Sequence, residues 1–420
     1  MNLYGQVLSP VSLRFNSASK YATESRPMTG IRKFGPYDMN LFAMSEIRCG
    51  LIYPRSSVRD KESFVKGLVY GEGQSYPGFK PWFRVALQFD PFDEHEIIEE
   101  HPQAIQRAAM SLATHNCDLV FVLVTQRNEE IYSIGKAVLL SNGIPCQYVL
   151  TSRLGTNQTP WVLANIALAT YAKVGGTPWV VADTTDHREL IMGVSRAQDK
   201  NRKYVVGFVT LFNQDGEYLL LHSKTPVVDW SDYVHGLREL IIDAYNEYLQ
   251  VYGVPGSLVI HFHKRPGYRE LEAVEGALTR LGLRIPYAMV HLNEYSGFRL
   301  FDTSHRTYVP PTGLRVDIGL RRALLLLDGR EGEKRSRMGV PNVWDVGLDR
   351  RSTMSADEFP RLLKQIQCFA KVNWRGFNAK SLPVTINYSQ CICALALDIG
   401  LGSWNSLIAN GKLREKAWFL

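Results

Sequence analysis

The sequence lacks any long run of apolar residues. Its longest apolar stretches, Ala323–Leu327 and Cys391–Leu397, are far shorter than the roughly 20 residues that a membrane-spanning helix needs. The N-terminal region mixes polar groups with short apolar runs, which is not the pattern of a secretory signal. We therefore expect no membrane insertion by this chain and a cytoplasmic location.

Cysteine is scarce, and its spacing excludes the common zinc-binding frameworks. The six cysteines are scattered, and none forms a Cys-x-x-Cys pair. In a chain of this size they are best interpreted as reduced, buried thiols of an intracellular protein. They are Cys49, Cys117, Cys146, Cys368, Cys391 and Cys393.

Acidic residues are slightly outnumbered by basic ones. The chain has 48 Lys and Arg against 41 Asp and Glu, a formal net charge of +7. This excess favours polyanionic partners such as nucleic acid but does not establish one. The 420 residues, of which 45% are hydrophobic and 21% charged, suffice for two domains of ordinary globular composition.

A strand–helix–strand pattern in the first half of the chain predicts a parallel sheet. Asp118–Thr125 is an apolar β-type run, Glu130–Leu140 has helical spacing, and Cys146–Leu150 is a second strand. This order is typical of a βαβ unit. Ahead of it we predict a strand at Trp82–Phe89, an acidic loop at Asp90–Glu100 and a helix at Gln103–Thr114.

The pattern changes after a helix predicted at Trp161–Lys173. The turn Asn213–Gly216 favours a hairpin between two of the strands that follow. Closely spaced strands followed by alternating helices and strands indicate an RNase H-like α/β architecture. The predicted strands are Trp179–Ala182, Glu189–Ser195, Tyr204–Leu211, Glu217–His222, Leu258–His263 and Pro286–Leu292, with helices at Asp232–Val251 and Glu270–Leu281.

Four residues make a candidate phosphate site. Tyr132 and Lys136 are four apart on a predicted helix and share one face. They follow the helix start, where free backbone N–H groups and the helix dipole favour an anion. Gln147 opens the next strand, and Lys173 ends the helix that leads into the second domain. Together they would suit a terminal phosphate with a base stacked on the tyrosine, although each alone also fits an ordinary surface residue.

The segments that carry these residues resemble the MID domain of Argonaute proteins. The family's nucleotide pocket uses Tyr-x-x-x-Lys, then Gln, then Lys, the order found in Asp118–Val149 and at Lys173. Asn165–Trp179 is similar to the family's lysine-containing helix and the entry to PIWI, and Gly30–Tyr37 to the motif that precedes MID in short members. The resemblance implies an N-terminal segment at residues 1–40, a Rossmann-like MID domain at 41–165 and an RNase H-like PIWI domain at 166–420.

The resemblance also implies a role for the last residue. In the family its carboxylate folds back into the pocket and helps to hold a divalent cation on the first and third guide phosphates. This chain ends Ala417-Trp-Phe-Leu420, an apolar tail that can pack inward, the alternative being a frayed terminus. We therefore expect Mg²⁺ at the guide 5′ end, with the Leu420 carboxylate contributing.

The resemblance further predicts that the cleavage site is missing. Active PIWI domains use a two-metal mechanism that needs several converging carboxylates. Where the first aspartate belongs, in a Gly-Ile-Asp context, this chain has Gly193-Val-Ser195. The second position falls on His263 or Lys264, and no Asp or Glu occurs from Ser257 to Tyr268. The remaining candidates are Asp199, Asp398 and the pair His261 and His263. The two carboxylates are too few or misplaced for a metal pair, and two histidines without a third ligand do not make a zinc site.

A glycine-containing basic loop at Asp328–Gly339 is a candidate contact for a nucleic-acid backbone. Its acidic residues dilute the charge, so an ordinary solvated loop is the alternative. The basic side chains are Arg330, Lys334, Arg335 and Arg337.

These features together favour a guide-binding Argonaute that recognises complementary nucleic acid without cutting it. Base pairing supplies the specificity in such systems, and RNA-guided DNA targeting is the expected arrangement, although the residues do not distinguish RNA from DNA. Two alternatives remain: an active RNase H-like guide-dependent nuclease with atypical metal ligands, and a protein-interaction module with a relic pocket. The resemblance to short family members also implies a separate APAZ-containing effector chain, of Sir2, TIR or nuclease type, and a role in prokaryotic defence against plasmids or phage.

Overall fold

The computed structural model describes residues 5–182, 188–198, 205–223, 230–331, 339–377 and 382–420. The chain forms two compact units, each assembled from separate segments. Unit 1 comprises Met1–Ser12, Val181–Asn373 and Lys380–Cys393, and unit 2 comprises Leu13–Val180, Trp374–Ala379 and Ala394–Leu420. The predicted boundary between residues 165 and 166 falls inside helix α6 (Thr159–Lys173). The whole of that helix and the last residues of the chain belong to unit 2.

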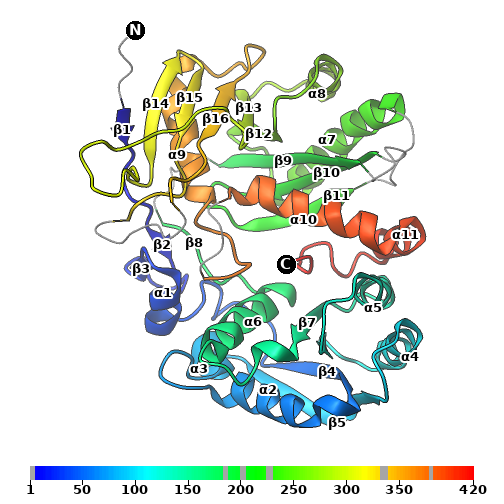
Figure 1. The fold of residues 1–420 in the computed structure, drawn as a ribbon. Helices are drawn as coiled ribbons and strands as arrows, with labels where there is room; N and C mark the ends of the chain where they lie inside the picture. The colour runs from blue at the N-terminus through cyan, green and yellow to red at the C-terminus, as the bar shows by residue number, and fades with distance from the viewer. Residues whose placement is uncertain (1–4, 183–187, 199–204, 224–229, 332–338, 378–381) are drawn as a thin grey trace. The chain divides into compact units, whose positions relative to one another are not determined.

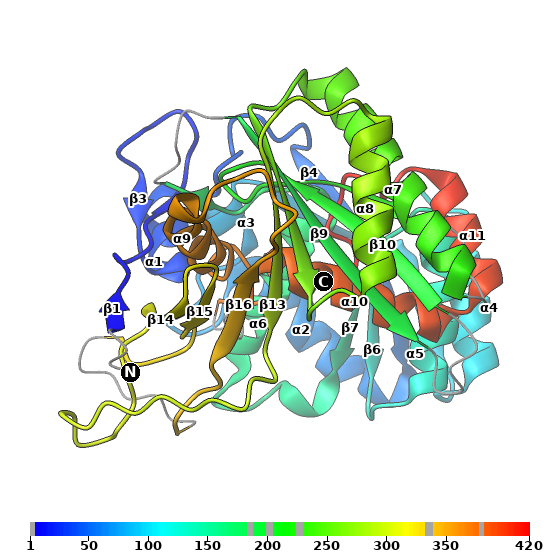
Figure 2. The same ribbon diagram turned by 90° about the horizontal axis from the view of Figure 1, so that it is seen from above.

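Unit 2 contains a parallel four-stranded sheet with the order β5-β4-β6-β7. All six residues of β6 (Leu119–Val124) are buried, which explains why a continuous apolar run marks this strand. The predicted βαβ unit is confirmed, because β6 and β7 (Cys146–Leu150) are parallel and flank α5 (Glu129–Ser141) in the chain (Figure 2). The other elements are β4 (Glu46–Pro54), β5 (Ala86–Ile97), α2 (Val58–Tyr70) and α4 (Pro102–Ala113).

The prediction of a strand at Trp82–Phe89 is wrong in its first half. A short helix, α3 (Phe79–Phe83), buries three aromatic side chains, and Arg84 ends it in the left-handed region with φ 63°. The segment predicted as an acidic loop is also largely wrong, because β5 continues to Ile97. Basic partners compensate the acidic residues there: Arg48 pairs with Asp93, and Lys61 with Glu94 at 2.9 Å.

Unit 1 is built on a nine-stranded sheet with the order β1-β14-β15-β16-β13-β12-β9-β10-β11. Its core is an antiparallel meander, β9 (Glu189–Gln198), β10 (Val205–Phe212) and β11 (Tyr218–Ser223), which confirms the predicted hairpin. Parallel strands β12 (Ser257–His263) and β13 (Tyr287–Asn293) continue from β9. Helices α7 (Trp230–Tyr252) and α8 (Tyr268–Arg280) bury their apolar faces together with these strands. This is the predicted RNase H-like α/β arrangement.

Several elements were not predicted from the sequence. Figure 2 shows β14, β15 and β16 continuing the sheet of unit 1 beyond β13. Helix α10 (Val384–Ile399) is followed by α11 (Leu401–Asn410), which packs on α5. Strand β8 (Val180–Val181) lies within the strand predicted at Trp179–Ala182. The remaining elements are α1 (Pro27–Phe34), α9 (Phe359–Phe369), β1 (Gly5–Val7), β2 (Leu13–Arg14), β3 (Thr23–Glu24), β14 (Leu314–Gly319), β15 (Arg322–Leu325) and β16 (Trp344–Leu348).

All six cysteines are free, five of them buried and Cys391 half-buried. Within the ranges that the structure describes, no helix combines the length and apolar character needed to cross a membrane.

Candidate nucleic-acid-binding site

The four residues predicted to bind phosphate come together in unit 2. The ammonium group of Lys173, at the end of α6, donates to Gln147 Oε1 at 2.7 Å and to the carbonyl oxygen of Cys146 at 2.8 Å. Lys136 Nζ lies 4.7 Å from the centroid of the Tyr132 ring. The two lysines are close enough that the charge of Lys136 lowers the pKa of Lys173. Elements separated in the chain thus deliver two cations, an amide and an aromatic ring to one place.

Both lysines are buried without an acidic partner. Lys136 is 3% exposed and Lys173 1%, and within the described residues neither forms an ion pair with a carboxylate. Burial, with the charges of Lys136 and Arg375 adding to it, lowers the pKa of Lys173 well below its usual range. A buried ammonium group is costly unless an anion neutralises it. The site therefore has the charge and the hydrogen-bond donors for an anion.

The start of α5 does not supply the backbone donors expected there. The Asn128 side chain caps the helix, accepting hydrogen bonds from the amides of Glu130 at 3.0 Å and Ile131 at 3.1 Å. Glu129 and Glu130 also place negative charge in the first turn, which opposes a second anion. The expectation that the helix start offers its free amides to a phosphate is therefore wrong. Lys136 lies about two turns further along the same helix.

Two residues at this site were not found from the sequence. Arg375 lies close enough to lower the pKa of Lys173, but more than 200 positions separate them and no local pattern links them. The Tyr148 ring packs against Tyr132 with centroids 4.9 Å apart, and its hydroxyl donates to the carbonyl of Ile131. A Cβ at Gly135 would lie 2.2 Å from that hydroxyl, so glycine is required for this packing.

The C-terminal tail is buried, as predicted, and does not fray. Ala417, Trp418 and Phe419 are each at most 5% exposed, and the Trp418 ring lies 6.2 Å from that of Trp404. The stem of Lys416 packs next to Gly175, just past the end of α6. The tail therefore passes beside the helix that carries Lys173. No described contact joins Leu420 to the four site residues, so its place in the pocket stays a prediction.

The positions predicted for the first two metal ligands lie on neighbouring strands of unit 1. The parallel register pairs Val194 with Phe262, and the next residue on each strand is Ser195, within β9, and His263, at the end of β12. Lys264 lies beyond the strand, exposed and with φ 68°, so His263 occupies the second position. A neutral hydroxyl and an imidazole thus stand where carboxylates were sought.

Helix α10 packs against this part of β9 and β12. Thr385 Oγ1 lies 3.0 Å from His261 Nδ1, and Gln390 Nε2 lies 2.9 Å from His263 Nε2. Gly193 permits this approach, because a Cβ there would lie 2.2 Å from the carbonyl oxygen of Thr385. Complete burial lowers the pKa of His261 to about 3, so this imidazole is neutral and serves the packing of the helix.

One carboxylate at this edge was missed. Glu294, immediately after β13, lies 3.7 Å from His263 Nε2, and its place after a predicted strand was the available signal. Asp398 is exposed, eight residues beyond Gln390 and so about 12 Å further along α10, and Asp199 falls outside the described residues. Across the described ranges, no group of three or more His, Cys, Asp or Glu side chains is arranged to hold a metal ion.

Residues 118–317, which include Tyr132, Lys136, Ser195 and His263, match the Piwi domain family. A protein argonaute of Cereibacter sphaeroides is 27% identical over 93% of this chain and 56% of its own length. The chain is thus similar to Argonaute and Piwi proteins, and the matched region contains the residues of both candidate sites. A Piwi protein of Archaeoglobus fulgidus is 24% identical over 72% of the chain and 75% of its own length. The chain thus spans little more than half of the first of these Argonaute relatives.

Solved Argonaute structures share the fold. Clostridium butyricum Argonaute, bound to a guide DNA and a 19-mer target DNA, matches 95% of this chain and 53% of its own with a TM-score of 0.75 and 16% identity. Drosophila Piwi matches 99% of this chain and 56% of its own with a TM-score of 0.74 and 16% identity. Both matches extend over unit 1 and unit 2, so the likeness in fold is not confined to one of them.

The predicted basic loop at Asp328–Gly339 is only partly described. Arg330 pairs with Asp302 at 2.8 Å and donates to the carbonyl of Val309 at 3.2 Å. Its guanidinium group is therefore engaged within the protein. The other three predicted residues, Lys334, Arg335 and Arg337, lie outside the described residues.

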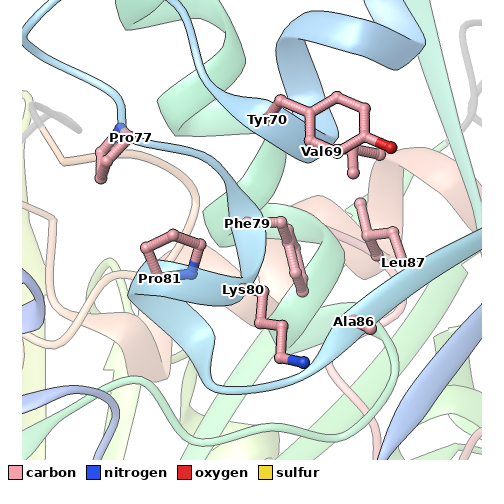
Figure 3. Close-up of a pocket in the computed structure, with 8 residues that line it drawn as sticks. All are labelled: Val69, Tyr70, Pro77, Phe79, Lys80, Pro81, Ala86 and Leu87. Carbon is pink, nitrogen blue, oxygen red and sulfur yellow. The ribbon is translucent and has the colours of Figure 1, made fainter.

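An apolar pocket of about 250 Å³ lies elsewhere in unit 2, between the end of α2, α3 and the start of β5 (Figure 3). Its single charged side chain is Lys80, and it shares no residue with the lysine site. It is therefore not part of the candidate guide-binding site. The lining residues are Val69, Tyr70, Pro77, Phe79, Lys80, Pro81, Ala86 and Leu87.

Proposed function

We propose that this chain holds the 5′-phosphorylated end of a guide strand and recognises complementary nucleic acid by base pairing. The observation that carries the proposal is the burial of Lys136 and Lys173 without a carboxylate. A 5′ phosphate would neutralise both ammonium groups and accept their hydrogen bonds. The Tyr132 ring offers a stacking surface for the first base, and the guide-bound and target-bound state of the Clostridium butyricum protein supports the same class of ligand here.

Guide binding with and without the phosphate tests this proposal. Charge-assisted contacts contribute about 1.5–3 kcal/mol each, so Lys136→Ala should weaken a phosphorylated guide roughly tenfold or more. An unphosphorylated guide should lose much less. Lys66→Ala, which removes an exposed lysine of α2, is the matched control and should change neither affinity. Equal weakening of both guides by Lys136→Ala would contradict the pocket assignment.

We also propose Mg²⁺ at the guide 5′ end. The four pocket side chains offer cations, a hydroxyl and an amide but no carboxylate, so they do not make a metal site by themselves. Mg²⁺ prefers oxygen ligands, and the donors that fit are the Leu420 carboxylate together with the phosphates of the guide. Deleting Leu420 should then remove the difference in guide affinity between Mg²⁺ and chelator, and a Mg²⁺ effect that survives the deletion would contradict this role.

We propose further that the chain does not cleave its target. Ser195, His263 and the single nearby carboxylate of Glu294 provide too few ligands for two metal ions. Loaded with guide, the protein should bind a complementary strand in Mg²⁺ or Mn²⁺ and release it intact. Guide-directed cutting that Glu294→Gln abolishes would establish the alternative, an RNase H-like nuclease with atypical ligands.

Recognition without cleavage has an effect only through another protein. We therefore propose that target binding by this chain, as a short prokaryotic Argonaute, activates an associated APAZ-containing effector of Sir2, TIR or nuclease type. RNA-guided DNA targeting in defence against plasmids or phage is the setting that the resemblance supports. Affinity purification from the native host checks this, and recovery of guide and target without a stoichiometric partner protein would contradict it.

A further inference from the structure

The connection between β13 and β14 exposes an unusual number of aromatic side chains. It is the yellow-green segment that follows β13 in Figures 1 and 2, and we call residues Glu294–Tyr308 the aromatic segment. A single exposed apolar side chain is ordinary, whereas several in one segment indicate a binding surface. The exposed fractions are 69% for Tyr295, 44% for Phe298, 59% for Phe301 and 56% for Tyr308.

The aromatic segment is held in place by the rest of unit 1. Ser296 Oγ donates to the carbonyl of Val343 at 2.6 Å, and the amide of Asp302 donates to the carbonyl of Tyr308 at 3.0 Å. Arg330 also donates a hydrogen bond to the carboxylate of Asp302, near the middle of the segment. Tyr308 has φ 55°, a conformation that a non-glycine residue keeps only where its surroundings impose it. The aromatic rings are therefore presented on a fixed backbone.

The charge that this surface presents is positive. Both of its acidic residues have internal partners: Glu294 lies by His263, and Asp302 pairs with Arg330. Arg299 and Arg306 are exposed. From the end of β12, Lys264 adds a further cation, with Nζ 5.2 Å from the centroid of the Tyr295 ring. Basic side chains thus alternate with the aromatic ones.

The aromatic segment also leaves the sheet at the edge where ligands bind in α/β folds. It begins where β13 ends, beside the end of the parallel strand β12. Ligands of α/β sheets bind outside the carboxyl ends of the strands. His263 ends β12 at this same edge, and Lys264, the next residue, reaches the ring of Tyr295.

We propose that the aromatic segment, together with Lys264, is a stacking platform for unpaired bases of a nucleic-acid strand. Every base has a π-face, so aromatic rings accept unpaired bases of any sequence while basic side chains follow the phosphates. Aromatic residues and Arg are also enriched at protein interfaces, so a protein partner is the competing occupant, and oligonucleotide binding that the variants leave unchanged would favour it. The proposal shares with the proposed function the nucleic-acid ligand, but it does not depend on the 5′-phosphate pocket.

The test uses the full chain and an unphosphorylated single-stranded oligonucleotide that carries 2-aminopurine. Phe298→Ala and Phe301→Ala remove rings from ordinary backbone positions and leave the hydrogen bonds of the segment intact. A stacked base contributes about 1–3 kcal/mol, so each variant should weaken binding at least about fivefold. Stacking quenches 2-aminopurine, and both variants should lose part of that quenching. Leu320→Ala, at a residue 88% exposed in the same unit, is the control and should change neither quantity.

Measuring the preference for a phosphorylated guide in parallel separates this proposal from the proposed function. If that preference persists and the phenylalanine variants bind and quench like the wild type, the platform is overturned and the pocket stands. If the preference is absent while the variants lose affinity and quenching, the pocket is overturned and the platform stands. Affinity lost without any change in quenching would also overturn the platform, since stacking would not be the cause.

Discussion

Replacing Lys173 with methionine should separate the charge of the guide pocket from its shape. Methionine keeps most of the unbranched stem that fills the end of α6 and removes the terminal amino group, which donates to Gln147 and Cys146 in the free chain. Burial and the neighbouring charges hold the pKa of Lys173 well below its usual range. A bound phosphate would raise it again, because an adjacent anion favours the charged form. Guide binding should therefore be accompanied by proton uptake at Lys173.

The sign and size of the effect follow from linkage. The bound state holds the proton more tightly than the free state, so affinity for a phosphorylated guide should fall as the pH rises from the lowered pKa of the free chain to that of the complex. One proton limits the slope to about tenfold per pH unit. Lys173→Met should remove that slope and, through one lost charge-assisted contact of about 1.5–3 kcal/mol, weaken the phosphorylated guide roughly ten- to a hundredfold.

Calorimetry at successive pH values above about 7.5, in two buffers that differ in ionisation enthalpy, counts the protons taken up. The phosphate has its second pKa near 6, so in this range it stays ionised and contributes almost none. Wild-type protein should take up a measurable fraction of a proton with a phosphorylated guide and less with an unphosphorylated one. Equal uptake by wild type and Lys173→Met would refute the reasoning, because the proton would then be bound elsewhere.

Three further predictions concern stability. Burial raises the pKa of Asp38 to about 6. The contribution of this carboxyl to the free energy of unfolding is therefore present below about pH 4 and is lost as the pH rises through 6, a loss of about 3 kcal/mol. Asp38→Asn should flatten this part of the pH profile of urea unfolding, and an unchanged profile would contradict the prediction. Gly193→Ala should lower the unfolding midpoint, because the new Cβ would lie 2.2 Å from the Thr385 carbonyl, and it should do so far more than an alanine at an open site. Gly236→Ala provides that comparison, because nothing lies within 4 Å of the new Cβ inside α7. Thermal melts should show that the variant is more stable by about 0.5–1 kcal/mol. A lower stability would show that the site is not open.

The sequence was most informative where one strand or helix is buried on a regular pattern. Cys146–Leu150 was predicted with its observed bounds, and β6 was recognised because both of its faces are buried. Trp82–Phe89 was misassigned because aromatic residues favour strands in general, whereas here tertiary packing buries them on a short helix. The acidic stretch of β5 was misread since its basic partners, Arg48 and Lys61, lie on other elements.

In the candidate site, too, the residues linked by a local sequence pattern were found and those brought together only by the tertiary fold were missed. Tyr132 and Lys136 were found because four residues on one helix make a local pattern. Arg375 and Glu294 were missed because only the tertiary fold brings them to Lys173 and His263. The capping by Asn128 was also missed, although an Asn followed by two Glu is a common helix start, and it removes the backbone donors that the anion was expected to use.

The assembly of unit 2 from three separate segments has a consequence for the order of events during synthesis. Its sheet and α6 come from the first half of the chain, but α11 packs on α5 and the stem of Lys416 lies beside Gly175. These contacts join residues more than 200 positions apart, so they form late and slowly. A nascent chain emerges from its N-terminus onward, and the neighbourhood of Lys173 stays incomplete until α11 and Lys416 have left the ribosome. A guide strand that needs the finished pocket would consequently be loaded only after these late segments have been made and packed.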